Sequence, residues 1–247
     1  MEDWSSPEKP WTNRQIRELR KAIVEGGDAI EGLSYAQIAV WYGQIIGDIV
    51  ERINGIAVVD LPISDLHVSS RVKTITTLRD KLKRDPAMQI PRVHDIMGVR
   101  VAAQMSLSVQ DIFVNRIEQV LPVAQVSDIR KNPHSGYRAV HAIVKLPNGV
   151  FCEVQVRTVL QDAWANCYEL AGDIYGRDIR YGGKPDHDDH GLVNHLQHLS
   201  ELVALMEQAS DRSMNDAVLA ANTQLLETIQ STAEMLESNR DILKIKR

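Results

Sequence analysis

The segment 135–158, which reads SGYRAVHAIVKLPNGVFCEVQVRT, constrains the fold more than any other part of the chain. Two runs rich in valine and isoleucine are separated by Asn148 and Gly149. An Asn-Gly pair between two such runs is the strongest local signal for a two-residue hairpin turn. The sequence therefore predicts a β-hairpin here.

The hairpin is expected to have one polar face. On its second segment Glu153, Gln155 and Arg157 alternate with valines, so a strand places these three side chains on the same side. Tyr137 and His141 are expected on the facing strand. A carboxylate, an amide and a guanidinium in one row suit a ligand that carries a metal ion, phosphates and a base.

Composition bounds the class of protein. The 247 residues are 44% hydrophobic and 25% charged, which is enough apolar mass for a globular core. The net charge of −5 argues against a protein that coats nucleic acid over its whole surface, although it allows a local basic patch. Cys152 and Cys167 lack metal-site spacing and are expected to be free buried thiols. Without a signal peptide or an apolar span, the protein is expected to be cytoplasmic, with no membrane partner.

The order of the expected elements indicates the fold class. Two N-terminal helices precede alternating strands and helices, and a long helical region ends the chain. The expected elements are a helix from Thr12, a helix from Ser34 to Ile53, a basic helix from Ser70 to Arg84, a strand from Asp95 to Ala103, a helix capped by Ser108 with Val109, Ile112, Phe113 and Val120 inward, a strand from Val123 to Val126, the hairpin, a helix after Thr158, and helices from Leu192. This order favours an α/β (α+β) fold with a mixed, mostly antiparallel sheet flanked by helices.

The basic helix is the first candidate for ligand binding. Lys73, Thr77, Lys81 and Arg84 are spaced four, four and three apart, so they share one helical face, and Arg71 lies at its start. This row matches a polyphosphate in charge and reach. A solvated helix face explains the same spacing.

Asp95 and Glu153 are the second candidate. Each belongs to an apolar strand segment, where an unpaired carboxylate is costly to bury. Two carboxylates on neighbouring strands can share Mg²⁺ together with phosphate oxygens. The alternative is one ion pair each, for instance with Arg100 or Arg157. The acidic run DHDDH at 186–190 is interpreted as a solvated loop.

Four motifs in order give these weak signals a common meaning. They are R-x-K-x-x-x-T-x-x-x-K-x-x-R at 71–84, D-I-x-G-x-R at 95–100, G-Y-R-x-x-H at 136–141 and E-V-Q-V-R-T at 153–158. Together they resemble the synthetase domain of the RelA/SpoT family over roughly 65–182. The resemblance implies a nucleotidyltransferase-like fold that transfers pyrophosphate from ATP to the 3′-hydroxyl of an acceptor nucleotide, usually GDP or GTP, with Mg²⁺.

The resemblance also implies a role for each matching residue. Asp95 and Glu153 would bind the metal, and Glu153 would also take the proton of the attacking hydroxyl. The residues implied in ATP binding are Arg71 and Arg100 around the adenine, and Lys73, Thr77, Lys81 and Arg84 on the phosphates. Those implied in acceptor binding are Tyr137 under the base, with His141, Gln155 and Arg157 lining the pocket.

One departure from the family pattern concerns the acceptor. The family reads P-K-x-N-G-Y before the tyrosine, whereas this chain reads P-H-S-G-Y, with His134 near the place of the lysine that binds 5′-phosphates. The shortened loop resembles toxin-type small synthetases, some of which modify the 3′-CCA end of tRNA or make adenosine alarmones. We therefore expect the tRNA 3′ end as acceptor in preference to GDP or GTP. The basic residues of the first helix, which are Arg14, Arg17, Arg20 and Lys21, would then contact the tRNA backbone.

Three further expectations complete this interpretation. The chain is expected to divide into N-terminal helices at 1–64, a synthetase core at 65–183 and a C-terminal helical region at 184–247. A toxin would need an antitoxin protein as partner, and the C-terminal helices would serve self-association, partner docking or autoinhibition. The rival class is a non-catalytic nucleotide- or RNA-binding module, against which the presence of both Asp95 and Glu153 speaks.

Overall fold

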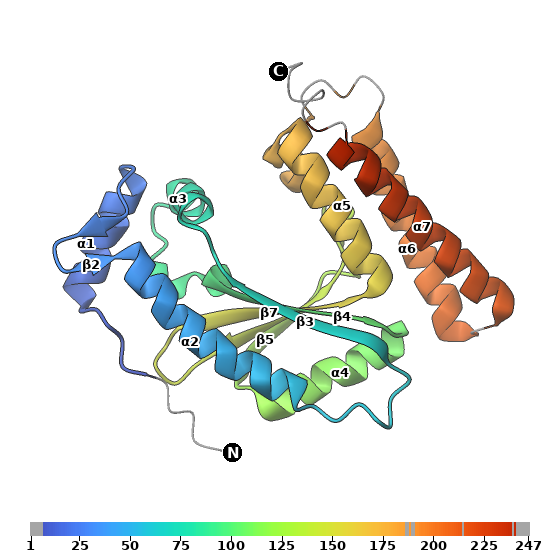
Figure 1. Cartoon of the computed structure of the whole chain (residues 1–247), viewed down its shortest axis with the longest axis horizontal. Coiled ribbons are helices and arrows are strands. Elements are labelled where there is room, and N and C mark those ends of the chain that lie inside the picture. Colours follow the sequence, from blue (N-terminus) through green and yellow to red (C-terminus); the bar gives the residue numbers. More distant parts are fainter. Residues whose placement is uncertain (1–6, 186–187, 189–190, 214, 239, 241–247) are drawn as a thin grey trace.

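The computed structural model describes residues 7–185, 188, 191–213, 215–238 and 240 (Figure 1). A five-stranded sheet lies at its centre. In spatial order the sheet consists of β3 (Ser64–Val72), β4 (Met97–Gln104), β7 (Phe151–Thr158), β6 (Val140–Lys145) and β5 (Val123–Asp128). β4 and β7 run parallel and the other neighbouring pairs are antiparallel. This mixed, mostly antiparallel sheet confirms the expected fold class.

Helices flank the sheet on both sides. The helices are α1 (Asn13–Val24), α2 (Tyr35–Asn54), α3 (Ile75–Arg84), α4 (Leu107–Val120), α5 (Val159–Tyr175), α6 (Leu192–Arg212) and α7 (Asp216–Ser238). Short 3-10 turns form η1 (Ile90–Arg92), η2 (His94–Ile96) and η3 (Arg177–Tyr181), and β1 (Ala29–Ile30) pairs with β2 (Leu33–Ser34). Figure 1 shows α2 and α4 against one face of the sheet, whereas α3 and α5 rise from the other.

Side-chain caps explain where several helices begin. Thr12, Ser34 and Thr158 each form a capping box with a glutamine three residues on, which satisfies two free backbone N–H groups at each start. The predicted cap of α4 is wrong: Ser106 accepts from the Val109 N–H, so Ser108 lies in the first turn. The buried stripe of α4 consists of Val109, Gln110, Phe113, Val114 and Ile117. Ile112, which was expected to face inward, lies beside this stripe and is 42% exposed.

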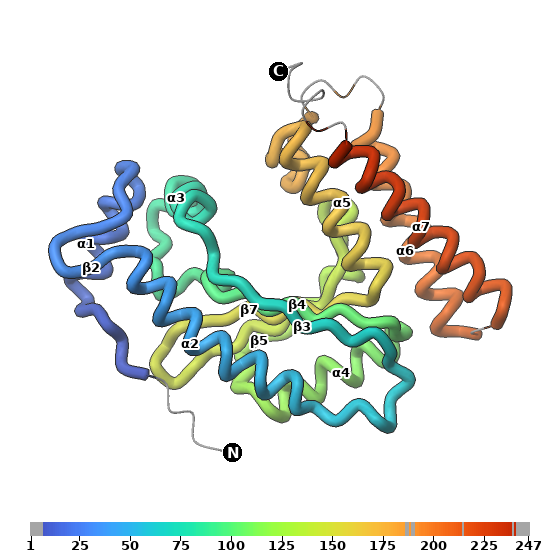
Figure 2. Tube along the Cα trace, in the orientation of Figure 1, coloured from blue at the N-terminus to red at the C-terminus, as the bar shows by residue number. Residues whose placement is uncertain are grey.

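The expected basic helix from Ser70 to Arg84 is wrong in its first part. β3 continues to Val72, which pairs with Met97, and α3 begins only after Thr74, whose hydroxyl accepts from the Thr77 N–H. The Cα trace in Figure 2 shows the chain passing from the end of β3 into α3 through a sharp turn. Arg71 therefore lies on a strand, and Lys73 lies in the connection.

The hairpin is confirmed, but its loop has three residues instead of two. The Gly149 N–H donates to the Leu146 carbonyl at 2.8 Å, and the Leu146 N–H donates to the Val150 carbonyl at 3.0 Å. Pro147 takes the second position of this turn, where its fixed φ is favourable. Gly149 then adopts φ +80°, a left-handed conformation that glycine accepts without strain.

Two hydrophobic cores hold the described residues together. The larger one joins the sheet to α1, α2, α3 and α4, and the second joins α5 to η3, α6 and α7. Cys152 and Cys167 are buried and free, as expected. Packing crosses both expected domain boundaries, at 64 and at 183, and the three-part division stays a prediction. No helix in the described part of the chain is long and apolar enough to cross a membrane.

Candidate functional site

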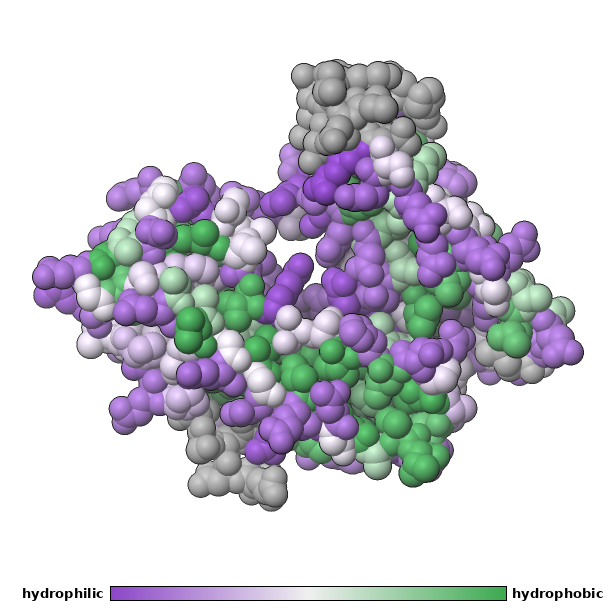
Figure 3. Space-filling model, in the orientation of Figure 1, coloured by the Kyte–Doolittle hydropathy of each residue, from purple (hydrophilic) through white to green (hydrophobic). Residues whose placement is uncertain are grey.

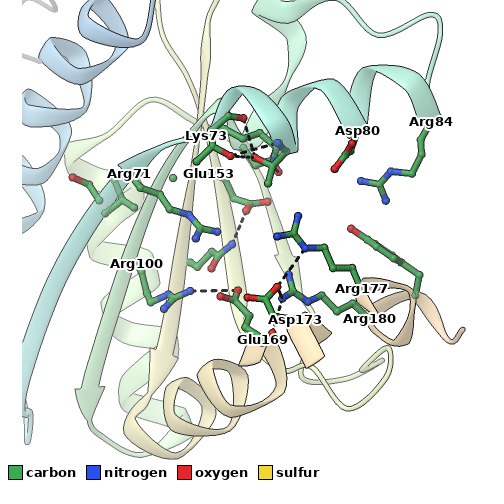
Figure 4. Close-up of a pocket in the computed structure, with 18 of the residues that line it drawn as sticks. Arg71, Lys73, Asp80, Arg84, Arg100, Glu153, Glu169, Asp173, Arg177 and Arg180 are labelled. Carbon is green, nitrogen blue, oxygen red and sulfur yellow. Dashed lines mark hydrogen bonds and ion pairs between the residues drawn. The ribbon is translucent and has the colours of Figure 1, made fainter. Parts of the chain in front are cut away.

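A polar cavity of about 620 Å³ opens on the face of the sheet that α2 and α4 leave uncovered. Figure 3 shows it as a hollow with hydrophilic side chains at the centre of the molecule, and Figure 4 shows the residues that line it. Its walls come from β3, β4, β7, α3, α5 and η3. Its cations are Arg71, Lys73, Lys83, Arg84, Arg100, Arg177 and Arg180, and its carboxylates are Asp80, Asp95, Glu153, Glu169, Asp173 and Asp178. Such a lining suits a highly charged ligand.

The sheet register places two of the expected residues, Arg71 and Glu153, in one row on either side of Gly98. Arg71 on β3 lies opposite Gly98 on β4, which in turn lies opposite Glu153 on β7. Paired residues on adjacent strands point to the same face, so all three belong to the cavity floor. In the next row Arg100 lies opposite Gln155. The cavity thus receives both expected adenine-binding arginines together with the carboxylate and the amide of the hairpin.

Asp95 receives two lysines. The Nζ atoms of Lys73 and Lys81 each lie 2.7 Å from one of its carboxylate oxygens. Asp95 belongs to η2 and not to β4, and its partners are these lysines and not Arg100 or Arg157, which corrects two expectations. Burial acts to raise the pKa of Asp95, but the two ammonium groups outweigh it and the net shift is downward. Asp95 is therefore ionised at neutral pH.

A tyrosine that the sequence did not single out fixes Lys73. The Tyr35 hydroxyl, at the start of α2, donates to the backbone carbonyl of Lys73. Burial, and next the negative charge of Asp95, raise the pKa of Tyr35 to about 12. The contact lies 38 positions away in sequence, and no local pattern could have predicted it.

The acceptor-side residues form a closed ring of contacts. Glu153 accepts from the Gln155 amide at 2.7 Å and lies 3.2 Å from the Nδ1 atom of His141. The Nε2 atom of His141 lies 2.7 Å from the Tyr137 hydroxyl. Arg157 closes the ring, because its Nη2 donates to that hydroxyl at 2.9 Å and to the Gln155 Oε1 at 2.8 Å. The structure therefore brings together five residues that the sequence assigned to one site.

The donors in this ring limit where its protons can lie. Because Arg157 can only donate, the Tyr137 oxygen accepts from it, whereas the direction of the hydrogen bond between Tyr137 and Nε2 of His141 depends on which ring nitrogen carries a hydrogen. A hydrogen on Nδ1 of His141 can be donated to Glu153, which is an acceptor on both oxygens. Burial acts to raise the pKa of Glu153, but the His141 and Gln155 contacts outweigh it and lower the pKa overall. An ionised Glu153 is consistent with every contact.

Tyr137 lies in the loop before β6, and its expected place on the facing strand is wrong. Its ring stacks on His134 at 5.6 Å between centroids with an interplanar angle of 16°, and the Arg157 guanidinium lies 5.1 Å from its centroid. Burial raises the pKa of Tyr137, although Arg157 opposes the shift. Arg157 itself is only 1% exposed. Arg157 therefore holds Tyr137 and Gln155 from within the core and does not line the cavity.

The wall formed by α5 and η3 was missed by the sequence assignment. Arg177, Arg180 and Tyr181 face the cavity from η3, and the Tyr181 ring lies 4.8 Å below the Arg84 guanidinium. Figure 4 shows Arg177 and Arg180 on the side opposite Arg71. The available signal was the run GRDIRYGG at 176–183, which concentrates cations next to glycines.

The four basic residues expected on the first helix differ in their surroundings. Arg20 donates to the Met88 carbonyl at 2.7 Å and to the Pro86 carbonyl, so it holds the loop after α3. Arg14 pairs with Glu18 at 2.8 Å on the surface. Arg17 and Lys21 are exposed. A contact of this helix with RNA stays a prediction, for which Arg14, Arg17 and Lys21 are exposed.

No group of three or more His, Cys, Asp or Glu side chains within the described residues is arranged to hold a metal ion. Most of the DHDDH run lies outside the described residues. Its Asp188 accepts from the N–H groups of Leu192 and Val193 at the start of α6, at 2.8 and 2.9 Å. This aspartate therefore caps a helix.

Comparison with known proteins places the central part of the chain in a known group. Residues 70–173 match the family model described as a region found in RelA / SpoT proteins. The matched range begins on β3 and ends within α5. It thus contains the cavity floor, Asp95 and the ring around Glu153.

Relatives extend the likeness beyond that region. The uncharacterized protein Rv1366 of Mycobacterium tuberculosis is 39% identical over 212 residues, which cover 84% of this chain and 76% of that protein. GTP pyrophosphokinase YwaC of Bacillus subtilis is 30% identical over 128 residues, which cover 44% of this chain and 60% of YwaC. The crystal structure of small alarmone synthetase 1 from Bacillus subtilis superposes with a TM-score of 0.58 at 22% identity, covering 72% of this chain and 94% of that one. That structure shares the fold.

Proposed function

Because this chain belongs to the RelA/SpoT family and is a pyrophosphokinase of that type, we propose that it transfers the β,γ-pyrophosphate of ATP to the 3′-hydroxyl of an acceptor nucleoside. The observation that carries the proposal is the position of Glu153. It is an ionised carboxylate in the floor of a cavity whose lining also includes the cations Lys73, Arg84 and Arg177. A base beside cations is what an attacking hydroxyl and a polyphosphate require.

The donor nucleotide is assigned to the side of the cavity formed by β3, β4 and α3. Arg71 and Arg100 extend from adjacent strands and can stack on the two faces of a purine. Lys73, in the connection before α3, and Thr77 and Arg84, on α3, line the cavity. The two cations can neutralise the phosphates, and the Thr77 hydroxyl can donate to them. Lys81 would join them by leaving Asp95. Positioning and charge neutralisation of this kind provide most of the catalysis in phosphoryl-type transfer.

The carboxylates fit a hard divalent cation such as Mg²⁺, which takes oxygen ligands and keeps several waters and phosphate oxygens. Asp95 and Glu153 lie near enough for the charge of Asp95 to act on the pKa of Glu153. Asp95 is occupied by Lys73 and Lys81, so it would become a metal ligand when those lysines move to phosphate. When bound, the ion would neutralise charge on the transferred pyrophosphate.

The reaction balances with the residues present. The acceptor 3′-oxygen attacks the β-phosphorus of ATP, the new O–P bond forms, and the bond between the β-phosphorus and the oxygen bridging to the α-phosphate breaks, which releases AMP. Glu153 takes the proton of the hydroxyl and then loses it to water. His141 and Gln155 hold the carboxylate in place through the reaction. A base in this position contributes about 10² to 10⁴ in rate.

The acceptor loop, residues 130–139 between β5 and β6, favours the 3′-terminal adenosine of tRNA as acceptor. A free nucleoside diphosphate brings several 5′-charges that need cations. Arg130 is already bound to Asp128 and Asp111, and Lys131 lies 3.3 Å from Asp128. A terminal nucleotide in RNA carries a single phosphodiester charge on its 5′ side, which makes a weaker demand on this loop.

GDP or GTP is the second candidate acceptor. Its support is the 30% identity to YwaC, which is named a GTP pyrophosphokinase. Small alarmone synthetase 1 of Bacillus subtilis, which shares the fold, has been crystallised with its product pppGpp. With either acceptor the assignment of Asp95 and Glu153 is the same. An antitoxin partner, self-association through α6 and α7, and a cytoplasmic location remain predictions of this proposal.

The test offers the purified chain ATP labelled at the γ-phosphate, together with tRNA, GDP, GTP or AMP in turn. Label on tRNA alone supports the RNA end, and label on GDP or GTP alone supports the nucleotide acceptor. Glu153→Gln is expected to abolish transfer while the thermal melt keeps its cooperative transition, whereas Asp80→Asn, a carboxylate change elsewhere in the same cavity, leaves transfer largely intact. ATP binding without transfer to any acceptor would favour a non-catalytic binding module.

A further inference from the structure

The acceptor loop is held by helix α6, which lies outside the matched family region. Figure 1 shows α6 and α7 packed beside α5, on the far side of α5 from α3. The contact runs through Ser200, which is 1% exposed and faces the loop. Its hydroxyl donates to the Gly136 carbonyl and accepts from Nε of Arg138 at 3.2 Å. One buried hydroxyl thus bonds to the residues on both sides of Tyr137.

Gly136 fits closely between α5 and α6. Its φ is +86°, and a Cβ atom there would lie 2.8 Å from the Trp164 ring and 3.1 Å from Cβ of Ser200. Trp164 is itself fixed to α6, because its indole N–H donates to the Leu196 carbonyl at 2.5 Å. The backbone before Tyr137 is therefore clamped between two helices, and α6 supplies one side of the clamp.

The start of the acceptor loop, at Arg130, is also linked to Ser200. Arg138 donates from Nη1 to the Arg130 carbonyl at 2.9 Å, so its guanidinium joins the start of the loop to Ser200. Inside the loop the Tyr137 N–H donates to the His134 carbonyl at 3.0 Å. These bonds set where the Tyr137 ring lies, and through the Tyr137 hydroxyl they set the ring of contacts around Glu153.

We propose that α6 is part of the acceptor site and that Ser200 is a positioning residue that fixes Tyr137 for the acceptor base. The inference rests on the proposed function for the identity of the acceptor, but not for the loop contact. The proposal gives α6 a role in the acceptor site of its own chain, in addition to any role of the C-terminal helices in self-association. Loosening the Ser200 contact lets the loop carrying Tyr137 move, while the ATP side of the cavity, formed by β3, β4 and α3, is left unchanged.

The test compares Ser200→Ala with Ser210→Ala. Ser210 also lies on α6, where it donates to the Met206 carbonyl and accepts from Asn222 of α7, so it tests general loosening of the helix pair without touching the loop. Hydrogen–deuterium exchange of the peptide covering 130–139 is the first readout. Loss of one buried hydrogen bond is expected to raise its exchange about fivefold to tenfold in Ser200→Ala and to leave it unchanged in Ser210→Ala.

The second readout is steady-state kinetics with whichever acceptor the wild type uses. Ser200→Ala is expected to raise KM for the acceptor about fivefold to tenfold with KM for ATP unchanged, because one hydrogen bond that orders the acceptor platform is lost. Unchanged exchange in Ser200→Ala, or an equal rise in Ser210→Ala, would overturn the proposal. So would a rise in exchange with an unaltered acceptor KM.

The two proposals fail in different ways. If the wild-type chain transfers to no acceptor, the proposed function fails, and the binding of nucleoside probes (AMP, GDP and a CCA trinucleotide) to both variants replaces KM as the second readout. A probe that binds the wild type and Ser210→Ala more tightly than Ser200→Ala supports the role of Ser200. Equal binding to all three proteins, or binding to none of them, refutes it.

Discussion

Replacing Tyr137 by phenylalanine tests the ring of contacts around Glu153 directly. The change removes one oxygen and keeps the aromatic ring that stacks on His134. The lost hydroxyl accepts from Nη2 of Arg157 at 2.9 Å and forms a second hydrogen bond, of 2.7 Å, with Nε2 of His141. Both partners are buried or nearly so, and water cannot easily replace the missing oxygen. The variant therefore measures what the hydroxyl contributes to the fold and to the site.

The expected loss of stability follows from these two bonds. A hydrogen bond to a charged donor contributes about 1.5–3 kcal/mol net, and a neutral one about 0.5–1.5 kcal/mol. Arg157 keeps its bond to the Gln155 Oε1 and its 2.9 Å contact with Asp162, which favours the lower end of the range. We expect the free energy of unfolding to fall by about 2 kcal/mol, or Tm by roughly 4–8 °C for a chain of this size.

The measurement is urea unfolding followed by far-ultraviolet circular dichroism. Tyr181→Phe serves as the matched control, because its ring is 68% exposed and the same atom is removed there. A surface change of this kind is expected to stay within about 0.5 kcal/mol. Equal stabilities of the two variants would show that the Tyr137 hydroxyl is not bound as described, and the argument for an ordered Glu153 would lose its basis.

Kinetics of the same variant show whether the Tyr137 hydroxyl orients Glu153 or contacts the acceptor directly. Phenylalanine can still stack on a base, so acceptor KM is expected to change little. The imidazole of His141 loses its fixed partner, and kcat is expected to fall because Glu153 is less well held. A large rise in acceptor KM with unchanged kcat would instead mean that the hydroxyl contacts the acceptor.

Three further predictions concern groups around the site. Gly136→Ala is expected to lower the free energy of unfolding by roughly 1 kcal/mol or more in urea titrations, since it forces a left-handed residue and a clash with Trp164. Burial raises the pKa of Glu207 above its ordinary 4.5, so the stability that its protonated form contributes is fully present below that value and is lost as pH rises through the folded pKa. Glutamine at position 207 cannot ionise. As pH rises from 4.5 to the folded pKa of Glu207, the wild type should therefore lose about 1.4 kcal/mol of stability per pH unit relative to Glu207→Gln, with no difference at about pH 4. Urea titrations across pH 4 to 8 measure this difference. Asp95→Asn releases Lys73 and Lys81, so this variant should bind metal-free ATP more tightly in equilibrium dialysis. Weaker binding would show that the ion pairs of Asp95 with the two lysines order the site.

The sequence predicted the parts of the site that depend on local periodicity. Glu153 and Gln155 share a face because alternation along a strand requires it, and the structure keeps that face. The position of Tyr137 depends instead on Ser135 at φ +50° and on the isolated bridge between His134 and Tyr137, which no period describes. The tyrosine was therefore assigned to the correct site but to the wrong element.

Long-range packing explains what the sequence could not supply. Tyr181 reaches the cavity because Gly176, at φ +101°, ends α5 and turns the chain back toward α3. Its contact with Arg84 joins segments far apart in the sequence, and neither residue carries a local signal for the other. In the same way α6 meets the acceptor loop only through the tertiary packing of α5, and Ser200 in sequence is an ordinary helix residue.

The charges of the cavity are arranged as pairs that a ligand must exchange. Lys73 and Lys81 are held by Asp95, and Arg100 donates to Asn166 at 2.7 Å and lies 3.5 Å from Asp162 on α5. A polyphosphate can draw the lysines away only if Asp95 gains another cation, because an unpaired carboxylate at this depth is costly. Donor nucleotide and divalent cation are therefore expected to bind together, each removing the cost that the other would meet alone. The same exchange leaves the contacts of Glu153 with Gln155 and His141 in place, since an amide and an imidazole are partners that no phosphate displaces.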